Sequence, residues 1–92
     1  MKEQIEQIKE YAKENNVPIM MEDGIEFLTD YIKKNNIKNI LEIGTAIGYS
    51  VIMMALVEKD IKITTIERDE NRYQEALKNI EIFNLENQIT PI

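Results

Sequence analysis

The stretch LEIGTAIGYS, residues 41–50, decides the fold of this chain. It begins inside a run rich in Ile and Leu, residues 39–43, which is typical of a buried parallel strand that is apolar on both faces. The strand stops at Gly44, and residues from about 46 to 57 are predicted to form a helix that is apolar almost all round. A strand, a glycine loop and a helix in this order indicate the first unit of an α/β fold.

Two further strands and one helix are predicted downstream of this unit. Residues 61–66 (IKITTI) are rich in β-branched side chains and indicate a second strand. Residues 70–83 are predicted to form an amphipathic helix, and residues 88–92 the start of a third strand. The resulting βαβαβ order predicts a parallel sheet with right-handed crossovers, which is half of a doubly wound, Rossmann-like fold.

Two helices precede the sheet. Residues 2–15 carry apolar side chains at helical spacing, and an Asn-Asn pair ends this first helix. The second helix is expected to begin at Asp23, which forms a capping box with Glu26, and to end at another Asn-Asn pair. We therefore expect one α/β domain over residues 1–92: a partial doubly wound parallel sheet preceded by two N-terminal helices.

Composition excludes several functional classes. Eleven Lys and Arg against seventeen Asp and Glu give a net charge of −6, which argues against a phosphate-binding face for nucleic acid. Without His or Cys, zinc sites, thiol chemistry and Ser-His-Asp triads are excluded within this chain. The charged N-terminus does not resemble a signal peptide, and the longest nearly uncharged run, 43–57, is too short to span a bilayer. A cytoplasmic protein without a membrane partner is expected.

The glycine loop is the predicted ligand site, because ligands of open α/β sheets bind beyond the carboxyl ends of the strands. Gly44 can adopt a positive φ and lets a ligand approach the backbone. Gly48 lets the helix start close to the strand. Ser50 lies in the first helical turn, where its hydroxyl and the free N–H groups can meet an anionic group such as a carboxylate.

Glu42 discriminates between ligands. A dinucleotide fingerprint would have glycine at this position and a pyrophosphate against the loop. A carboxylate about 4 Å from a phosphate costs about 4 kcal/mol at an effective dielectric near 20. The same carboxylate favours an ammonium or a sulfonium, and S-adenosylmethionine carries both, together with a carboxylate for the helix end. The alternative is that Glu42 pairs with a lysine at the rim of the sheet.

Glu67 is the second predicted anchor. It ends the second strand at the distance from Gly44 where nucleotide-binding βαβ units place the acid that accepts the ribose hydroxyls. The alternative is that residues 67–69 form a solvated loop in which Asp69 caps the next helix. Met20 is a further candidate for a ligand contact, with a place in the core as its alternative.

These residues resemble a known family. LEIGTAIGYS followed by TTIERDE, residues 64–70, resembles the class I S-adenosylmethionine-dependent methyltransferases. Within them, the chain is similar to the bacterial O-methyltransferase family 3, which includes catechol and caffeoyl-CoA O-methyltransferase-like proteins. The segment from Met20 to Leu28 is similar to the helix that precedes the first motif in that family.

The resemblance implies a function for each matching position. Glu42, Gly44 and Ser50 would contact the methionine part of S-adenosylmethionine, Glu67 would bind its ribose, and Met20 would lie near it. The family transfers a methyl group to a hydroxyl of a small catechol-like molecule or of a tRNA uridine. It positions the acceptor with a divalent metal such as Mg²⁺, held by residues beyond the fourth strand.

Only the N-terminal half of the family pattern is present, so we expect a truncated cofactor-binding portion that is inactive alone and needs Mg²⁺ only as a full-length protein. The open edge of the first strand is expected to pair with a second copy in a homodimer. Two alternatives remain: a dinucleotide-binding oxidoreductase half, which Glu42 disfavours, and a non-catalytic dimeric interaction module.

Overall fold

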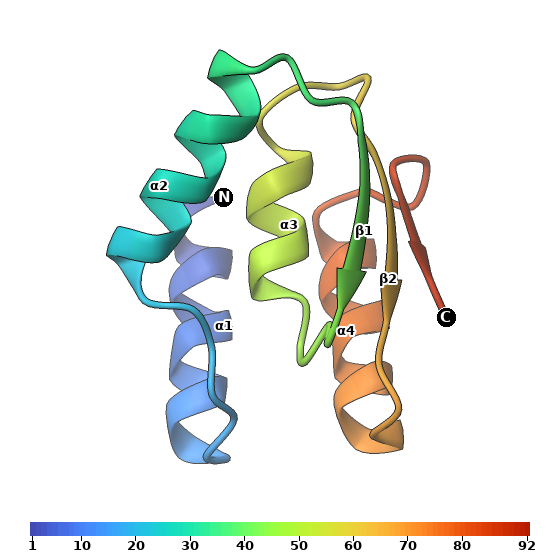
Figure 1. Cartoon of the computed structure of the whole chain (residues 1–92). Helices are drawn as coiled ribbons and strands as arrows, with labels where there is room; N and C mark the ends of the chain where they lie inside the picture. Colours follow the sequence, from blue (N-terminus) through green and yellow to red (C-terminus); the bar gives the residue numbers. More distant parts are fainter.

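The computed structural model of the chain describes all 92 residues. It confirms the predicted order of four helices and three strands (Figure 1). The elements are α1 (Lys2–Glu14), α2 (Glu22–Lys34), β1 (Asn39–Ile43), α3 (Tyr49–Ala55), β2 (Lys62–Ile66), α4 (Glu70–Ile82) and β3 (Ile89–Pro91). None of the helices is both long and apolar enough to cross a membrane.

The three strands form one parallel sheet in the order β1-β2-β3. The register places Glu42 directly beside Thr65, and Ile63 beside Ile89. Because β1 pairs only with β2, its outer edge is open. The carboxyl ends of β1 and β2 therefore lie side by side, and the two loops that leave them are neighbours.

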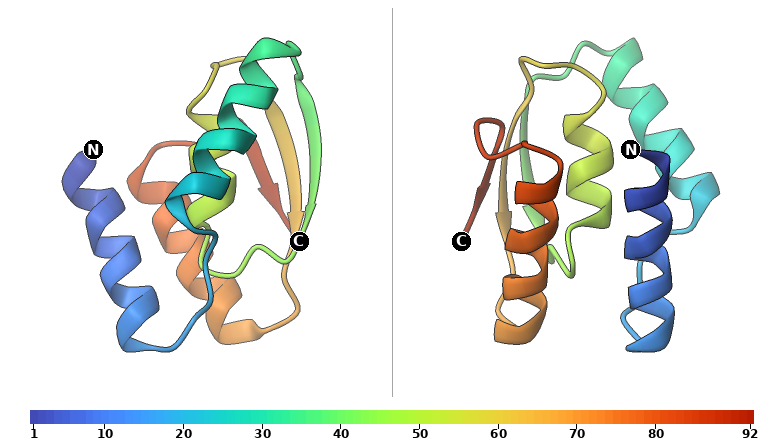
Figure 2. Two further views of the ribbon diagram at one scale, coloured as in Figure 1. Left: turned by 60° about the vertical axis from the view of Figure 1, so that its left-hand side comes forward. Right: turned by 180° about the vertical axis from the view of Figure 1, so that it is seen from behind.

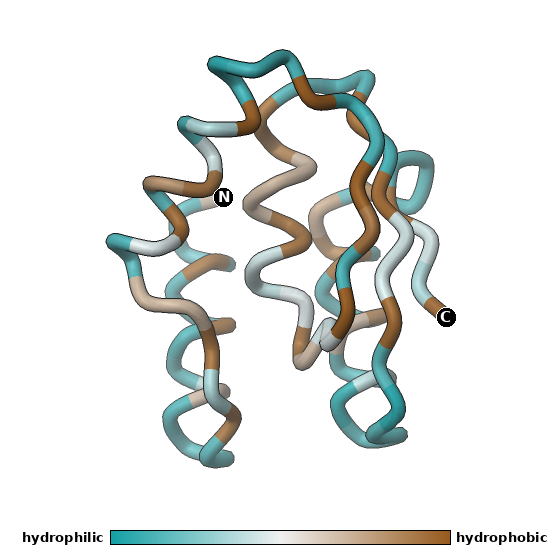
Figure 3. The backbone as a smooth tube through the Cα atoms, in the orientation of Figure 1, coloured by the Kyte–Doolittle hydropathy of each residue, from teal (hydrophilic) through white to brown (hydrophobic).

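All four helices lie on one face of the sheet (Figure 2). Helix α3 contacts β2 on one side and α1 and α2 on the other, so it lies in a middle layer. Its apolar character, visible in Figure 3, suits this place, and its Val51 and Ile52 are fully buried together with Ile47, Ile61 and Ile63. Burial of large aliphatic side chains against the sheet supplies the main favourable term in folding.

The prediction that β1 is buried on both faces is wrong for this chain. Leu41 and Ile43 point to the face that carries no helix and are 64% and 73% exposed. Ile40 and Glu42 point to the helical face and are half-buried. The reason is that both crossover helices, α3 and α4, pack on the same side of the sheet.

Helix starts were predicted with mixed success. Asp69 caps α4 by accepting a hydrogen bond from the Arg72 backbone N–H at 3.2 Å, a cap that the alternative interpretation of residues 67–69 predicts. The capping box at Asp23 is wrong, because the N-cap of α2 is Met21, two residues earlier, and α2 has no side-chain cap. Asp23 instead lies in the first turn, where a negative charge suits the helix dipole.

Candidate functional site

The loop from Gly44 to Gly48 connects β1 to α3 and is built on positive φ angles. Gly44 has φ +92°, Ala46 +51° and Gly48 +96°. Because a left-handed residue cannot continue a right-handed helix, α3 begins at Tyr49, and the expected start near residue 46 is wrong. A Cβ on Gly48 would lie 3.5 Å from the Ala76 Cα, so this glycine brings the start of α3 against α4 rather than only against its own strand.

Glu42 lies at the centre of a hydrogen-bond network below this loop. Its Oε2 accepts a hydrogen bond from Ser50 Oγ at 2.5 Å, and its Oε1 accepts one from Thr65 Oγ1 at 2.7 Å. Burial raises the pKa of the Glu42 carboxyl, the two hydroxyl donors oppose that change, and the negative charge of Glu67 adds to it. Glu42 forms no ion pair, so the alternative prediction that it pairs with a lysine at the rim of the sheet is wrong.

Ser50 lies in the first turn of α3, as predicted, but its hydroxyl hydrogen is donated to Glu42. Ser50 therefore orients that carboxylate. A negatively charged group of a ligand would meet the backbone N–H groups at the start of α3, which a helix leaves without intrahelical partners.

Glu67 holds the two neighbouring loops together. Its Oε1 accepts the Ala46 backbone N–H at 2.8 Å and its Oε2 accepts the Asp69 backbone N–H at 3.0 Å. These bonds stabilise the positive φ of Ala46 and tie the loop after β1 to the end of β2. A carboxylate has about four acceptor positions, so each oxygen can also accept a ligand hydroxyl.

A cavity of about 400 Å³ lies over the carboxyl end of β1. Its volume is in the range of small-molecule sites. The lining residues are Pro18, Ile19, Met20, Glu42, Ile43, Gly44, Thr45, Ala46, Tyr49 and Ser50. The cavity thus unites four of the predicted residues: Met20, Glu42, Gly44 and Ser50. Gly48 and Glu67 lie outside the lining, and Glu67 is joined to it through Ala46.

Sequence reasoning missed Thr45, Tyr49 and Thr65. Thr45 and Thr65 are buried and hydrogen-bonded to each other, and Thr65 reaches Glu42. The signal for Thr65 was a hydroxyl at an inward-facing position of a strand, since buried polar groups require partners. Tyr49 is almost fully buried, and no pattern in the sequence distinguishes it from a core aromatic.

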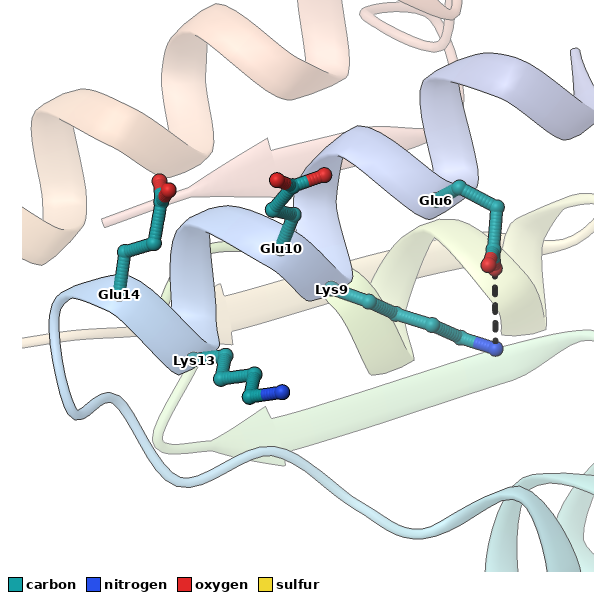
Figure 4. A pocket seen from close by; sticks show the side chains of 5 residues that line it. All are labelled: Glu6, Lys9, Glu10, Lys13 and Glu14. Atoms are coloured by element: carbon teal, nitrogen blue, oxygen red, sulfur yellow. Dashed lines mark ion pairs between the residues drawn. The ribbon is translucent and has the colours of Figure 1, made fainter.

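A second hollow, of about 610 Å³, lies along the outer face of α1 (Figure 4). It is lined only by charged side chains, namely Glu6, Lys9, Glu10, Lys13 and Glu14. Lys9 bonds to Glu22 at 2.6 Å and to Glu6 at 3.4 Å. This solvated helix face lacks the apolar lining of a small-molecule site.

No group of three or more Asp, Glu, His or Cys side chains in the chain is placed to hold a metal ion. The resemblance places the residues that hold the divalent metal beyond the fourth strand, outside residues 1–92.

Comparison with known proteins identifies the family. The O-methyltransferase family model matches residues 1–91. A Staphylococcus aureus structure, described as a candidate caffeoyl-CoA O-methyltransferase, is 45% identical with a TM-score of 0.91, over 96% of this chain and 42% of that one. A Bacillus cereus O-methyltransferase in complex with SAH is 28% identical with a TM-score of 0.87, over 98% of this chain and 42% of that one.

A third similar structure agrees in fold alone. The O-methyltransferase TomG of Streptomyces achromogenes, in complex with SAM, is 22% identical with a TM-score of 0.84, over 97% of this chain and 41% of that one. The chain thus spans about two fifths of the length of these relatives. On its sequence match and its α/β fold, the chain belongs to the O-methyltransferase family.

Proposed function

We propose that this chain binds S-adenosylmethionine over the carboxyl ends of β1 and β2, as the cofactor-binding part of an O-methyltransferase. The observation that carries the proposal is the half-buried Glu42 carboxylate, which lines a cavity of about 400 Å³ that has no cationic residue in its lining. Burying a carboxylate without a cation is unfavourable, so the cavity is matched to a ligand that brings the positive charge.

Each part of S-adenosylmethionine has a counterpart in the chain. Glu42 faces the methionine ammonium, and the backbone N–H groups at the start of α3 face its carboxylate. Gly44, with φ +92° and nothing within 4 Å of a would-be Cβ, leaves room for the ligand against the backbone. Glu67 accepts the ribose hydroxyls, and Met20 forms an apolar wall of the cavity.

The dinucleotide alternative is disfavoured by charge. A pyrophosphate against the same loop would approach Glu42, and each phosphate charge about 4 Å away would cost about 4 kcal/mol at an effective dielectric near 20. The Bacillus cereus relative in complex with SAH supports the methyltransferase assignment instead.

The proposed reaction is transfer of the methyl group from the sulfonium to a substrate hydroxyl. As the new C–O bond forms, the S–CH₃ bond breaks. The acceptor is a small catechol-like molecule or a tRNA uridine. Such a transfer relies on orienting both reactants. We propose that residues 1–92 alone bind the cofactor without transferring the methyl group, since the proposal assigns lining residues of the cavity to the cofactor and none to the acceptor.

Calorimetric titration of the chain with S-adenosylmethionine, its demethylated product and NADH tests the proposal. We expect binding of the first two and none of NADH. Glu67→Gln should weaken binding, while Glu70→Gln, which removes the same charge from the neighbouring turn, should leave it unchanged. NADH binding would favour the oxidoreductase alternative, and the absence of all binding would favour the interaction module.

We also propose that the open edge of β1 pairs with a second copy. The support is an unpaired strand edge beside two exposed apolar side chains, Leu41 and Ile43. Sedimentation velocity should show a dimer at micromolar concentration that Ile43→Lys dissociates. A monomer at all accessible concentrations would refute this arrangement.

A further inference from the structure

Two buried threonines extend the hydrogen-bond network behind Glu42. Thr45 Oγ1 and Thr65 Oγ1 are 2.5 Å apart, and Thr65 Oγ1 donates to Glu42 Oε1 at 2.7 Å. Thr45 is 2% exposed and Thr65 is not exposed. The register of the sheet places Thr65 directly beside Glu42, so the contact is built into strand pairing.

The direction of this chain of hydrogen bonds follows from counting hydrogens. An ionised carboxylate only accepts, so the single hydroxyl hydrogen of Thr65 goes to Glu42. The Thr65 oxygen can then only accept from Thr45. The order is therefore Thr45 to Thr65 to Glu42, with every donation directed toward the carboxylate. Successive donors polarise one another, which strengthens the last bond.

We propose that Thr65, supported by Thr45, is a positioning residue that orients the Glu42 carboxylate and keeps it ionised for a cationic ligand. The inference rests on the proposed function of Glu42 as the group that meets the positively charged part of S-adenosylmethionine.

Hydroxyl groups are the neighbours of Glu42 that stabilise its ionised form. Burial and the negative charge of Glu67 both raise the pKa of Glu42, whereas the hydrogen bonds from Ser50 and Thr65 lower it. Among the other residues that line the cavity, Tyr49 is the one titratable side chain, and none is a cation. Hydrogen bonds to the charged form are thus the stabilising interactions that the chain supplies.

A purely structural threonine at this position would be replaceable by valine. Valine has nearly the same shape, and a buried face of a strand accepts it readily. Loss of the hydroxyl would, however, leave Glu42 Oε1 without its donor and Thr45 without its acceptor. A purely structural role of Thr65 and a role in positioning Glu42 therefore predict different results for Thr65→Val.

The first experiment follows the side-chain carboxyl carbon of Glu42 by NMR during a pH titration of the free chain, with Glu42→Gln to assign the signal. Thr65→Val should move the Glu42 pKa upward, and Thr65→Ser should restore it. Thr45→Val should produce a smaller change in the same direction. Thr64→Val is the matched control, because Thr64 is the neighbouring threonine on the opposite face of β2.

The second experiment measures the affinity for S-adenosylmethionine from pH 5 to 8 by calorimetry. Loss of a hydrogen bond to a charged group changes a binding constant by about tenfold or more. We therefore expect Thr65→Val to weaken binding about tenfold near pH 6, to move the acid-side loss of affinity to higher pH, and Thr64→Val to do neither.

The inference is overturned if Thr65→Val leaves the Glu42 titration unchanged, or if the folded variant binds with wild-type affinity throughout the pH range. Failure of the unmodified chain to bind S-adenosylmethionine is a separate result. It would refute the proposed function, while the titration of the free chain would still decide whether Thr65 holds Glu42 ionised.

Discussion

Glu42→Gln isolates the charge at the centre of the proposed site. The substitution keeps the shape of the side chain and removes its negative charge. The amide oxygen can accept a hydrogen bond from one of the two hydroxyls, Ser50 or Thr65, and the amide NH₂ can donate to the other after its hydroxyl rotates. The fold should therefore persist, and the effect should appear in ligand binding.

The expected magnitude follows from the geometry of a carboxylate facing an ammonium. At about 4 Å and an effective dielectric near 20, the attraction is about 4 kcal/mol. Part of it is offset by the loss of remaining water around the two charges. A net loss of about 2–3 kcal/mol corresponds to roughly 30- to 150-fold weaker binding of S-adenosylmethionine.

The assay is calorimetric titration of wild type, Glu42→Gln and Glu70→Gln with S-adenosylmethionine and its demethylated product. Both ligands carry the methionine ammonium, and only the first carries the sulfonium. Equal losses for the two ligands are expected if Glu42 meets the ammonium. A folded Glu42→Gln protein that binds within threefold of wild type would refute the reasoning.

The same variant should change how stability depends on pH. Because the folded chain raises the Glu42 pKa above its ordinary value of 4.5, the folded state holds this proton more tightly than the unfolded state. The contribution of Glu42 to stability thus falls as pH rises from 4.5 through the raised folded pKa. Urea denaturation should show Glu42→Gln gaining stability relative to wild type between pH 4 and pH 7. A difference that is independent of pH would contradict this.

Substitutions at four further positions test the local structure around the site by urea denaturation. Gly48→Ala should destabilise the chain by about 1–2 kcal/mol, because φ is +96° at this position. Gly24→Ala should cost less than Gly48→Ala, because Gly24 has an ordinary helical conformation in α2 and its new Cβ, 2.9 Å from Met20 Cγ, requires only that the Met20 side chain shift. Equal losses for the two glycine substitutions would contradict the argument. Asp69→Ala should cost about 1 kcal/mol through loss of the α4 cap, and Asp69→Asn should restore most of it. Asn79→Ala should cost about 1–3 kcal/mol, since the buried amide donates to a loop carbonyl at 2.8 Å, and a change below 0.5 kcal/mol would refute that role.

Much of the fold follows from local patterns in the sequence. The β-branched run 61–66 and the Ile-rich run 39–43 were recognisable as strands, because their side chains pack well on a pleated surface. The Asn-Asn pairs were recognisable as helix ends, and Asn16 and Asn36 indeed adopt φ of +54° and +52°. Local signals of this kind depend on a few neighbouring residues, which is why they can be read without the tertiary structure.

Other features depended on contacts distant in sequence. The start of α2 differs from the one predicted at Asp23: the helix begins after Met21, and Glu22 in its first turn bonds to Lys9 on another helix. The exposure of Leu41 and Ile43 depends on which face of the sheet the helices cover. The importance of Thr65 depends on strand register, which places it beside Glu42 across 23 residues of chain.

The sequence by itself therefore determined the family, the order of the elements and the residues that end β1 and β2. These are properties of short motifs whose chemistry, such as a glycine that permits positive φ, is local. Only the tertiary structure decided that Ser50 and Thr65 both donate to Glu42, and that Glu67 secures the loop at Ala46. The physical reason is that hydrogen bonds and burial depend on which segments meet in space. The pairing of β1 with β2 places Thr65 beside Glu42, and the packing of α3 against the sheet adds Ser50.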